Sequence, residues 1–334
     1  MITMLWAKIK TYMRLGRIHS SVLTGLAPVC TAAAMGISIP FIHYLLLFLI
    51  GFLFHIFLFV FNEIRDVDVD STSVSLEAKP LIDGSMSIKK AKIFMFLSVV
   101  LIFLLTLVFF LDQAFILILV SIAAFIFGGL YDILGKSFPH SDYFIALMIF
   151  FIALYGAFSV TTTLSLFVII ISLLALTQML INNIIAGLKD IDHDFIAGGM
   201  STPLRMGVLI KGKRFAVSKG FVAYLTFLKI IHISLTIFPF MTGLMPFQIW
   251  QFYIVIILIA IAIFFMLRFL TFKTFNREKI MRAIGFHEMF AFMVIPFLLL
   301  GYIGYISALF LVFFPAVWLG IFLKIMYGRL MPTI

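Results

Sequence analysis

The chain has 334 residues, of which 64% are hydrophobic and 11% are charged, and its net charge at pH 7 is +10. This composition excludes an ordinary soluble globular protein. An internal disulfide is also excluded, because Cys30 is the only cysteine. The excess of basic residues suits a membrane face with anionic lipids, and no interleaving of aromatic and basic residues points to nucleic acid as a partner. We therefore predict an all-α polytopic membrane protein that lies in the lipid bilayer.

Apolar runs of about twenty residues, the length that crosses a bilayer, recur along the whole chain. The last run is too long for one helix, and Gly301, Gly304 and Ser307 could divide it into two. The sequence thus predicts a helical bundle of nine or ten transmembrane helices. The expected spans are 18–39, 41–61, 91–111, 114–131, 143–161, 166–188, 221–240, 249–270 and 286 to the end.

Lys and Arg gather in every second connection between these spans, and such residues accumulate on the cytoplasmic side. The N-terminal residues 1–17 and the loops 62–92 and 189–215 are basic, whereas the connections on the other side contain no Lys or Arg. We therefore expect one integral-membrane domain over residues 1–334, with its N-terminus and both loops in the cytoplasm. Lys324 agrees with this orientation only if the last run crosses twice, which favours ten spans.

Seven of the fourteen acidic residues stand in two short stretches, each at the cytoplasmic end of an apolar run. On a continuing helix, Asn62, Asp66 and Asp70 share one face because they follow at i, i+4 and i+8. We call these three residues the first ladder. Asp190 and Asp194 repeat the spacing and form the second ladder. Stacked carboxylates repel one another unless a cation lies between them, and Mg²⁺ is commonly held by a few carboxylates together with substrate phosphates.

Basic and polar residues accompany the ladders on the same predicted side. Lys79 precedes a Pro and a nearby Gly, so we expect it in a shaped loop. Tyr131 and Lys136 close the fourth span, Lys189 precedes the second ladder, and Arg205 follows it. Cations beside two metal-binding ladders would suit a diphosphate group.

These residues resemble the motifs of the UbiA superfamily of intramembrane prenyltransferases. The first ladder matches the family's Asn-x3-Asp-x3-Asp motif, and the second ladder, with Lys189 before it, matches its Asp-x3-Asp motif. The resemblance covers residues 10 to 300 in order, spacing and topology. The further matches are Lys79, Pro80 and Gly84, then Tyr131 with Lys136, and then Thr202, Pro203 and Gly207.

The chain departs from the family pattern at three points. Glu63 stands where many members have Asp, a change expected to leave metal binding intact. Ala186 stands where many have Asn, and Asn182 or Asn183 could substitute for it. Members are usually described with nine spans, and this chain is expected to have nine or ten. The second departure leaves the ligand set of the second ladder open.

The resemblance implies a Mg²⁺-dependent prenyltransferase that moves a polyprenyl group from an allylic prenyl diphosphate to a small acceptor, in lipid or quinone biosynthesis. The acceptor stays open between a quinone-precursor aromatic, a prenylglyceryl phosphate, a porphyrin and a sugar phosphate, and the oligomeric state is also open. The implied metal ligands are Asn62, Asp66, Asp70, Asp190 and Asp194, with the four Asp residues as catalytic residues. The implied diphosphate-binding residues are Lys79, Tyr131, Lys136, Lys189, Arg205 and Arg17, the last of which could equally be an interfacial anchor.

A cation-coupled membrane transporter is the alternative function, because acidic residues on membrane helices also line ion paths. The ladders stand at helix ends on one side, however, and transport sites usually lie near the midplane. A catalytically silent homologue is a third interpretation. It is disfavoured because every principal acid is retained.

Two further pairs of ionisable residues lie within apolar runs. Lys229 and His232 belong to the seventh span, where such residues are commonly functional, although Lys229 could instead snorkel to the interface. Glu288, with His287, could face the acceptor. An acid at a helix start, stabilised by the helix dipole, is the simpler explanation for Glu288.

Overall fold

Helices make up nearly all of the regular structure, as predicted. The computed structural model describes residues 2–70, 79–135, 138, 140–196, 198–212, 214–328 and 330. A small antiparallel hairpin of β1 (Leu209–Lys211) and β2 (Arg214–Ala216) is present beside the helices. The helices are α1 (Ile2–Leu15), α2 (Ser21–Ala34), α3 (Phe41–Asp70), α4 (Ile88–Phe109), α5 (Ala114–Leu134), α6 (Asp142–Phe158), α7 (Leu166–Ala186), α8 (Ile191–Ile196), α9 (Thr202–Arg205), α10 (Lys219–Thr242), α11 (Ile249–Leu270), α12 (Arg277–Phe292) and α13 (Val294–Tyr327), with short 3-10 turns η1 (Ile18–Ser20) and η3 (Leu111–Gln113).

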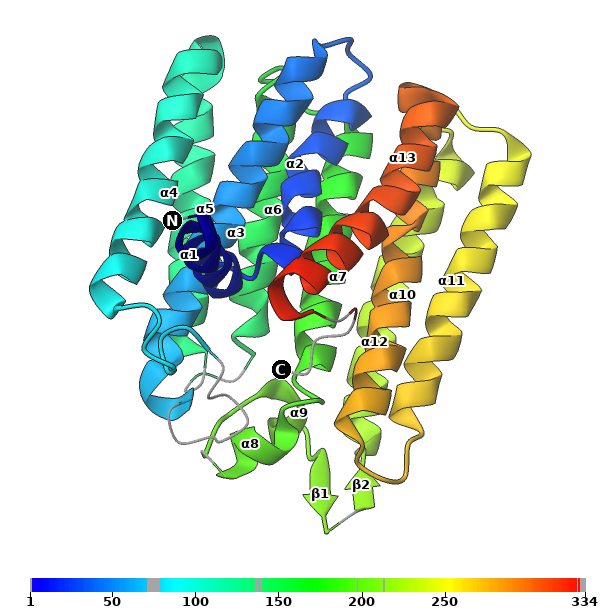
Figure 1. Ribbon diagram of the computed structural model, residues 1–334. Coiled ribbons are helices and arrows are strands. Elements are labelled where there is room, and N and C mark those ends of the chain that lie inside the picture. Colours follow the sequence, from blue (N-terminus) through cyan, green and yellow to red (C-terminus); the bar gives the residue numbers. More distant parts are fainter. Residues whose placement is uncertain are drawn as a thin grey trace.

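The long helices run side by side, and α1 lies across them and is seen end-on in Figure 1. Within the described residues, seven helical segments are long and apolar enough to cross a membrane, and shorter apolar helices cover Ile18–Ala34 and Asp142–Phe158. The last segment, Arg277–Tyr327, has 51 residues and starts earlier than the predicted position 286. At 1.5 Å per residue it would extend about 75 Å if straight, which is far more than one crossing needs.

Gly304 breaks this last segment. Its backbone has φ 75° and ψ 169°, a conformation that is essentially restricted to glycine. Beyond it, α13 turns back across the bundle towards the end that carries α8, α9 and the hairpin (Figure 1). Trp318, in the returning half, donates a hydrogen bond from Nε1 to the Ile18 carbonyl at 2.8 Å. The two ends of the sequence are thereby joined, and the turn agrees with the double crossing predicted from the C-terminal basic residues.

The helix α2 packs closely against α6 because small residues line the contact. A Cβ added to Gly156 would lie only 1.8 Å from the Pro28 carbonyl oxygen. Thr31 on α2 is fully buried and donates its hydroxyl to the Ala153 carbonyl on α6. Close approach at small residues and hydrogen bonds between helices are typical of membrane bundles. They hold α2 at the centre, directly after the junction that carries Arg17.

The backbone at Gly304 gives a test of this fold. We expect Gly304→Ala to lower the free energy of unfolding by about 1–3 kcal/mol, because an alanine is strained in that conformation even though the added Cβ meets no neighbouring atom. The measurement is thermal unfolding of the purified protein in detergent. Gly320→Ala is the matched control, because its added Cβ lies 3.9 Å from its nearest neighbour, Leu330. Equal stability of the two variants would contradict the turn at Gly304.

Candidate active site

The first ladder lies on one continuous helix, as predicted. The helix α3 runs without a break from Phe41 to Asp70 and extends past the apolar run. Asn62 and Asp66 are half-buried and lie one turn apart, whereas the side chain of Asp70 lies outside the described residues. Two polar groups of the ladder are thus held at the end of the bundle by a helix whose middle part is fixed in the apolar core.

The second ladder differs from the first in its backbone. The helix α7 ends at Ala186, so Asp190 lies in the connection to α8 and not on the apolar helix. The amide of Asp194 donates to the Asp190 carbonyl at 2.9 Å, which places the two acids one helical turn apart. The Lys189 ammonium lies 3.1 Å from an oxygen of Asp190. The i, i+4 spacing therefore marks a separate helical turn at this end of the bundle.

Arg277 fixes the second ladder from another part of the chain. Asn276 caps α12 by accepting a hydrogen bond from the Lys279 amide, which places Arg277 at the first position of the helix. Its Nη2 lies 3.0 Å from Asp192 and 3.8 Å from Asp190, and its Nε donates to the Lys189 carbonyl at 2.9 Å. Sequence reasoning missed this residue, because the only signal was its position in a basic connection.

Glu63 forms the most buried ion pairs that the structure describes. Its carboxylate is 5% exposed and accepts hydrogen bonds from Arg17 Nη2 at 2.5 Å and Nε at 3.1 Å. The Lys79 ammonium lies 3.2 Å from the same oxygen. Burial alone would lower the pKa of Arg17, but the Glu63 carboxylate raises it above its ordinary value, so the guanidinium stays charged. Two of the cations predicted to hold a diphosphate are therefore brought together by one carboxylate. We call these three residues the Glu63 cluster.

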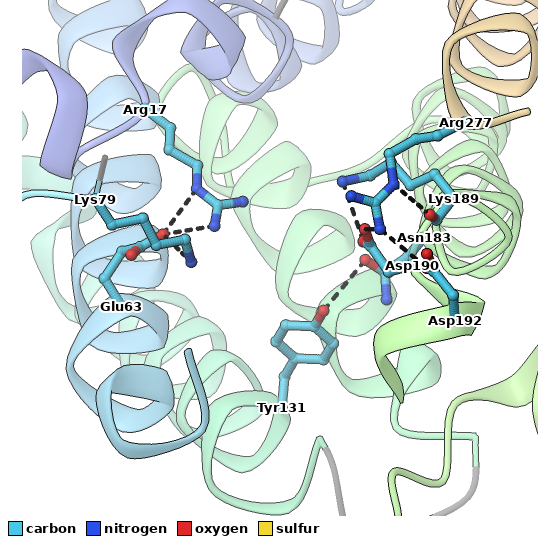
Figure 2. A network of polar contacts seen from close by, with 9 residues as sticks. All are labelled: Arg17, Glu63, Lys79, Tyr131, Asn183, Lys189, Asp190, Asp192 and Arg277. Carbon is cyan, nitrogen blue, oxygen red and sulfur yellow. Dashed lines mark hydrogen bonds and ion pairs between the residues drawn. The ribbon is translucent and has the colours of Figure 1, made fainter. Parts of the chain in front are cut away.

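The backbone of Arg17 is held in an unusual conformation. With φ 45° and ψ 47° it lies in the left-handed region, which costs a residue other than glycine about 1–2 kcal/mol. This turn separates α1 from η1. It directs the guanidinium towards α3, as Figure 2 shows.

Tyr131 takes part in a hydrogen-bonded chain that connects α5, α7 and the start of α6. Its hydroxyl donates to Asn183 Oδ1 at 3.2 Å, and Asn183 Nδ2 donates to Asp142 at 2.5 Å. Thr202, from the predicted Thr-Pro motif, also donates to Asp142. Of the two residues suggested in place of Ala186, Asn183 is thus engaged by Tyr131 and Asp142. The other, Asn182, accepts a hydrogen bond from Gln178 on its own helix.

Asp132 is a further acid at this end of the bundle that sequence reasoning missed. Its side chain is buried, and neither carboxylate oxygen has a hydrogen bond of good geometry to any described residue. The Asn62 amide lies beside it, and Asp66 is close enough to interact electrostatically. A buried carboxylate that has no cation beside it and no well-aligned hydrogen bond is costly. Asn62, Asp66 and Asp132 therefore fit a hard cation, for which oxygen donors are preferred.

Other predicted site residues contribute less to this arrangement. Lys136 lies outside the described residues. Arg205 ends α9 with an exposed side chain and forms no ion pair with any residue that the structure describes. Among the described side chains, no three of His, Cys, Asp and Glu gather closely enough to hold a metal by themselves. Mg²⁺ does not require such a cage, because it usually takes one or two carboxylates and completes its shell with water and phosphate.

The two groups of charges face one another. Figure 2 shows the Glu63 cluster on one side, Lys189, Asp190, Asp192 and Arg277 on the other, and Tyr131 between them. Asp190 also contributes to the raised pKa of Arg17, which places it within electrostatic reach across the gap. Segments that are far apart in sequence thus surround one polar region with both acids and cations. Such a region can hold an anionic group together with a divalent cation.

A comparison with sequence models of protein families shows to which family the chain is related. The sequence model of the UbiA prenyltransferase family matches residues 21–292. The chain belongs to this family. The membership confirms the resemblance seen in the motifs, and with the seven long apolar segments it makes the chain an integral membrane protein. The comparisons give the transporter alternative no support.

Solved structures share this UbiA fold at low sequence identity. A structure described as digeranylgeranylglyceryl phosphate synthase in membranes has a TM-score of 0.63 and 23% identity, covering 90% of this chain and 100% of that one. A UbiA homologue from Archaeoglobus fulgidus bound to GPP and Mg²⁺ has a TM-score of 0.62 and 20% identity, covering 85% and 99%. The apo UbiA homologue from Aeropyrum pernix K1 has a TM-score of 0.64 and 15% identity, covering 83% and 96%. Comparison with curated proteins by sequence gives no match.

The Glu63 cluster of this UbiA-family protein can be tested without substrate. We expect Glu63→Gln to lower the free energy of unfolding by about 3 kcal/mol, because it leaves Arg17 and Lys79 without their buried counter-charge. Inorganic pyrophosphate should then raise the melting temperature of this variant by more than that of the wild type, because the anion replaces the lost carboxylate.

The control is Glu278→Gln, which removes an exposed pair with Arg282 worth at most about 1 kcal/mol. Thermal unfolding in detergent measures both variants. If Glu63→Gln were as stable as Glu278→Gln, the ion pairs of Glu63 would not hold the site together.

Proposed function

We propose that this protein transfers a polyprenyl group from an allylic prenyl diphosphate to a small acceptor, with Mg²⁺, within the membrane. The observation that carries the proposal is the gathering of cations around two facing groups of acids at one end of the bundle. Family membership supports it, and so do structures of the Archaeoglobus fulgidus homologue described as bound to GPP or DMAPP with Mg²⁺. The acceptor is either a quinone-precursor aromatic or a prenylglyceryl phosphate, and the similarity to the digeranylgeranylglyceryl phosphate synthase structure supports the second type.

The acids divide into two sets of proposed metal ligands. On the α3 side, Asn62, Asp66 and Asp132 offer oxygens within one neighbourhood. On the other side, Asp190 and Asp194 lie one turn apart. The spacing on α3 adds Asp70 to the first set. Bound Mg²⁺ would neutralise the diphosphate and stabilise it as a leaving group.

The cations have two different roles in this proposal. Arg17 and Lys79 stay paired with Glu63 and bind diphosphate oxygens through N–H groups that Glu63 does not use, so the positive charge is in place before the carbon–oxygen bond breaks. Lys189 and Arg277 hold Asp190 in position, and Lys189 can also reach the phosphate side. Preorganised charge of this kind stabilises negative charge that develops in the transition state. The motif positions Lys136 and Arg205 would supplement these residues.

The reaction needs a dry pocket beside the diphosphate. When the allylic carbon–oxygen bond breaks, the diphosphate leaves with the electron pair, and the carbocation must meet the acceptor rather than water. The acceptor's nucleophilic atom then forms the new bond and releases a proton. The apolar faces of α2, α6 and α7, which are buried around the cavity described below, exclude water from this step.

We further propose that the end of the bundle carrying the site is cytoplasmic, as the basic connections indicate. A reporter fused after Ile334 should then respond as a cytoplasmic one, because the C-terminal half of α13 returns towards this end. A fusion within the connection between α6 and α7, at Thr162, should respond as external. A reversed pair of signals would contradict the orientation, and an external signal at Ile334 alone would contradict the second crossing of the last segment.

The ladders give the most direct test of catalysis. Replacing Asp66 or Asp190 with Ala should reduce prenyl transfer by at least about 100-fold while the protein stays folded, because each change removes charge stabilisation from the leaving group. The measurement is release of pyrophosphate from geranylgeranyl diphosphate across a panel of acceptors, with and without Mg²⁺. Asp112→Ala is the control, because Asp112 is exposed at the opposite end of the bundle. Wild-type turnover in either ladder variant would falsify the metal assignment.

Asp132 gives a second test, directed at the metal. Asp132→Asn should raise the Mg²⁺ concentration needed for half-maximal rate by about tenfold, without lowering the melting temperature in EDTA. The neighbouring Asn62 amide can pair with an asparagine as well as with an aspartate at this position, so the fold should tolerate the amide. Asp142→Asn is the matched control, because Asp142 accepts hydrogen bonds from Asn183 and Thr202. That variant should lose stability at an unchanged Mg²⁺ requirement, and the opposite pattern would remove Asp132 from the ligand set.

A further inference from the structure

A partly enclosed cavity of about 100 Å³ lies among α2, α6, α7, α10 and α12. Most of its lining is aliphatic or aromatic, which suits the hydrocarbon part of a ligand. One part of the wall is polar. The polar lining residues are Thr24, Thr31, Gln178, Asn182, His232 and Glu288.

The cavity reaches from the ladder end into the membrane interior. Asn182 stands about one turn before the end of α7, which leads directly to the second ladder. Glu288 lies eleven residues after the start of α12 at Arg277, a distance of about 16 Å along the helix. The prediction that Glu288 is a helix-start acid is therefore wrong, and the helix dipole does not account for it. An acid at this depth needs another explanation.

Two polar groups in the wall have hydrogen-bonding capacity that the protein leaves unused. The buried Oε1 of Gln178 has no hydrogen-bond partner, although its amide nitrogen donates to Asn182. Among the described residues Glu288 makes no hydrogen bond or ion pair, although Lys189 lies within electrostatic reach of it. His232, by contrast, is fixed by a 2.8 Å hydrogen bond between Nδ1 and Thr177. Buried polar groups are normally satisfied, so the open groups indicate a ligand with hydrogen-bond donors.

The charges around the cavity limit what that ligand can be. Among the described lining residues, Glu288 is the only acid and there is no Lys or Arg. Lys229 is buried near His232 but does not belong to the lining. The cations Arg17, Lys79, Lys189 and Arg277 lie with the ladders. Anionic groups are therefore attracted to the mouth, whereas a carboxylate or phosphate inside would meet Glu288.

We propose that this cavity binds the acceptor, and that the part of the acceptor that enters it is uncharged and carries a hydroxyl group. Gln178 Oε1 and Glu288 accept hydrogen bonds from it, and the apolar wall holds its carbon frame. Any anionic group of the acceptor stays outside, at the ladder end. This inference rests on the proposed prenyl transfer and names the kind of acceptor that the pocket selects.

A pair of photoreactive probes tests the proposal directly. The probes are 4-(3-trifluoromethyl-diazirin-3-yl)benzyl alcohol and the corresponding benzoic acid, which differ in charge and little in shape. Each is photolysed with the wild-type protein, with Glu288→Gln and with Glu278→Gln, and the labelled residues are mapped by mass spectrometry. Glu278→Gln is the control, since it makes the same change at an exposed position of the same helix. Retained binding of Mg²⁺ and geranylgeranyl diphosphate shows that each variant is folded.

We expect the alcohol to label lining residues of α7 and α12. With photolysis at alkaline pH, where Glu288 is ionised, the ratio of acid to alcohol labelling there should rise about tenfold in Glu288→Gln, because the like charge is gone. The ratio should stay unchanged in Glu278→Gln. Comparing the ratio between variants removes the effect of unequal partition into the membrane. Gln178→Leu is a second test variant. It should reduce labelling by the alcohol, because it removes the Oε1 acceptor of the hydroxyl group. An unchanged ratio in Glu288→Gln, or labelling confined to other surfaces, would overturn the proposal.

Transfer activity separates this inference from the function on which it rests. Wild-type protein labelled in the cavity should lose prenyl transfer but keep binding of geranylgeranyl diphosphate with Mg²⁺. Transfer that continues in fully labelled protein would exclude the cavity as the acceptor site while leaving the prenyltransferase function intact. Absence of pyrophosphate release with every acceptor would instead reject the function, and the labelling ratio would still report what the cavity binds.

Discussion

The buried carboxylate of Glu63 connects three parts of the site. It holds Arg17 from the N-terminal junction and Lys79 from the loop after α3, and it belongs to the helix that carries the first ladder. Two cations at this depth would be costly without a counter-charge. The Glu63 carboxylate therefore keeps the two cations charged and in place, and under the proposed function they would bind the diphosphate. In this way, a residue of α3 preorganises the charge that the proposed catalysis needs.

The opposite side of the site is built differently. The carboxylates of Asp190 and Asp192 are 41% and 37% exposed, whereas that of Glu63 is 5% exposed. Exposed ion pairs are weak, so Arg277 holds the second ladder less firmly than Glu63 holds Arg17 and Lys79. Asp190 also lies in a connection rather than on the apolar helix. The α3 side is thus held more firmly than the second ladder, and under the proposed function the second ladder would be the side that adjusts to the substrate.

Sequence reasoning recovered the features that are local in the chain. Apolar runs gave the helical bundle, and the i, i+4 spacing gave the ladder on α3, because both follow from helix geometry within a few residues. Pairs between distant segments gave no such signal. Arg277 and Asp132 could not be distinguished from other basic and acidic residues at helix ends, and Glu63 was read as a substitute for Asp rather than as the partner of Arg17. Glu288 was misplaced because the start of α12 was set too late, where the apolar run begins rather than where Asn276 caps the helix.

The hydrogen bond from Trp318 to the Ile18 carbonyl has a consequence for biosynthesis. Ile18 directly follows Arg17, whose left-handed backbone directs its guanidinium towards Glu63. The support of this junction is therefore supplied by a helix that leaves the ribosome some three hundred residues later. A nascent chain can insert its early helices and form the ladders. The hydrogen bond that supports the backbone next to Arg17 can form only when the last helix has been translated and has folded back. Under the proposed function, the complete diphosphate site would therefore form only when synthesis is finished.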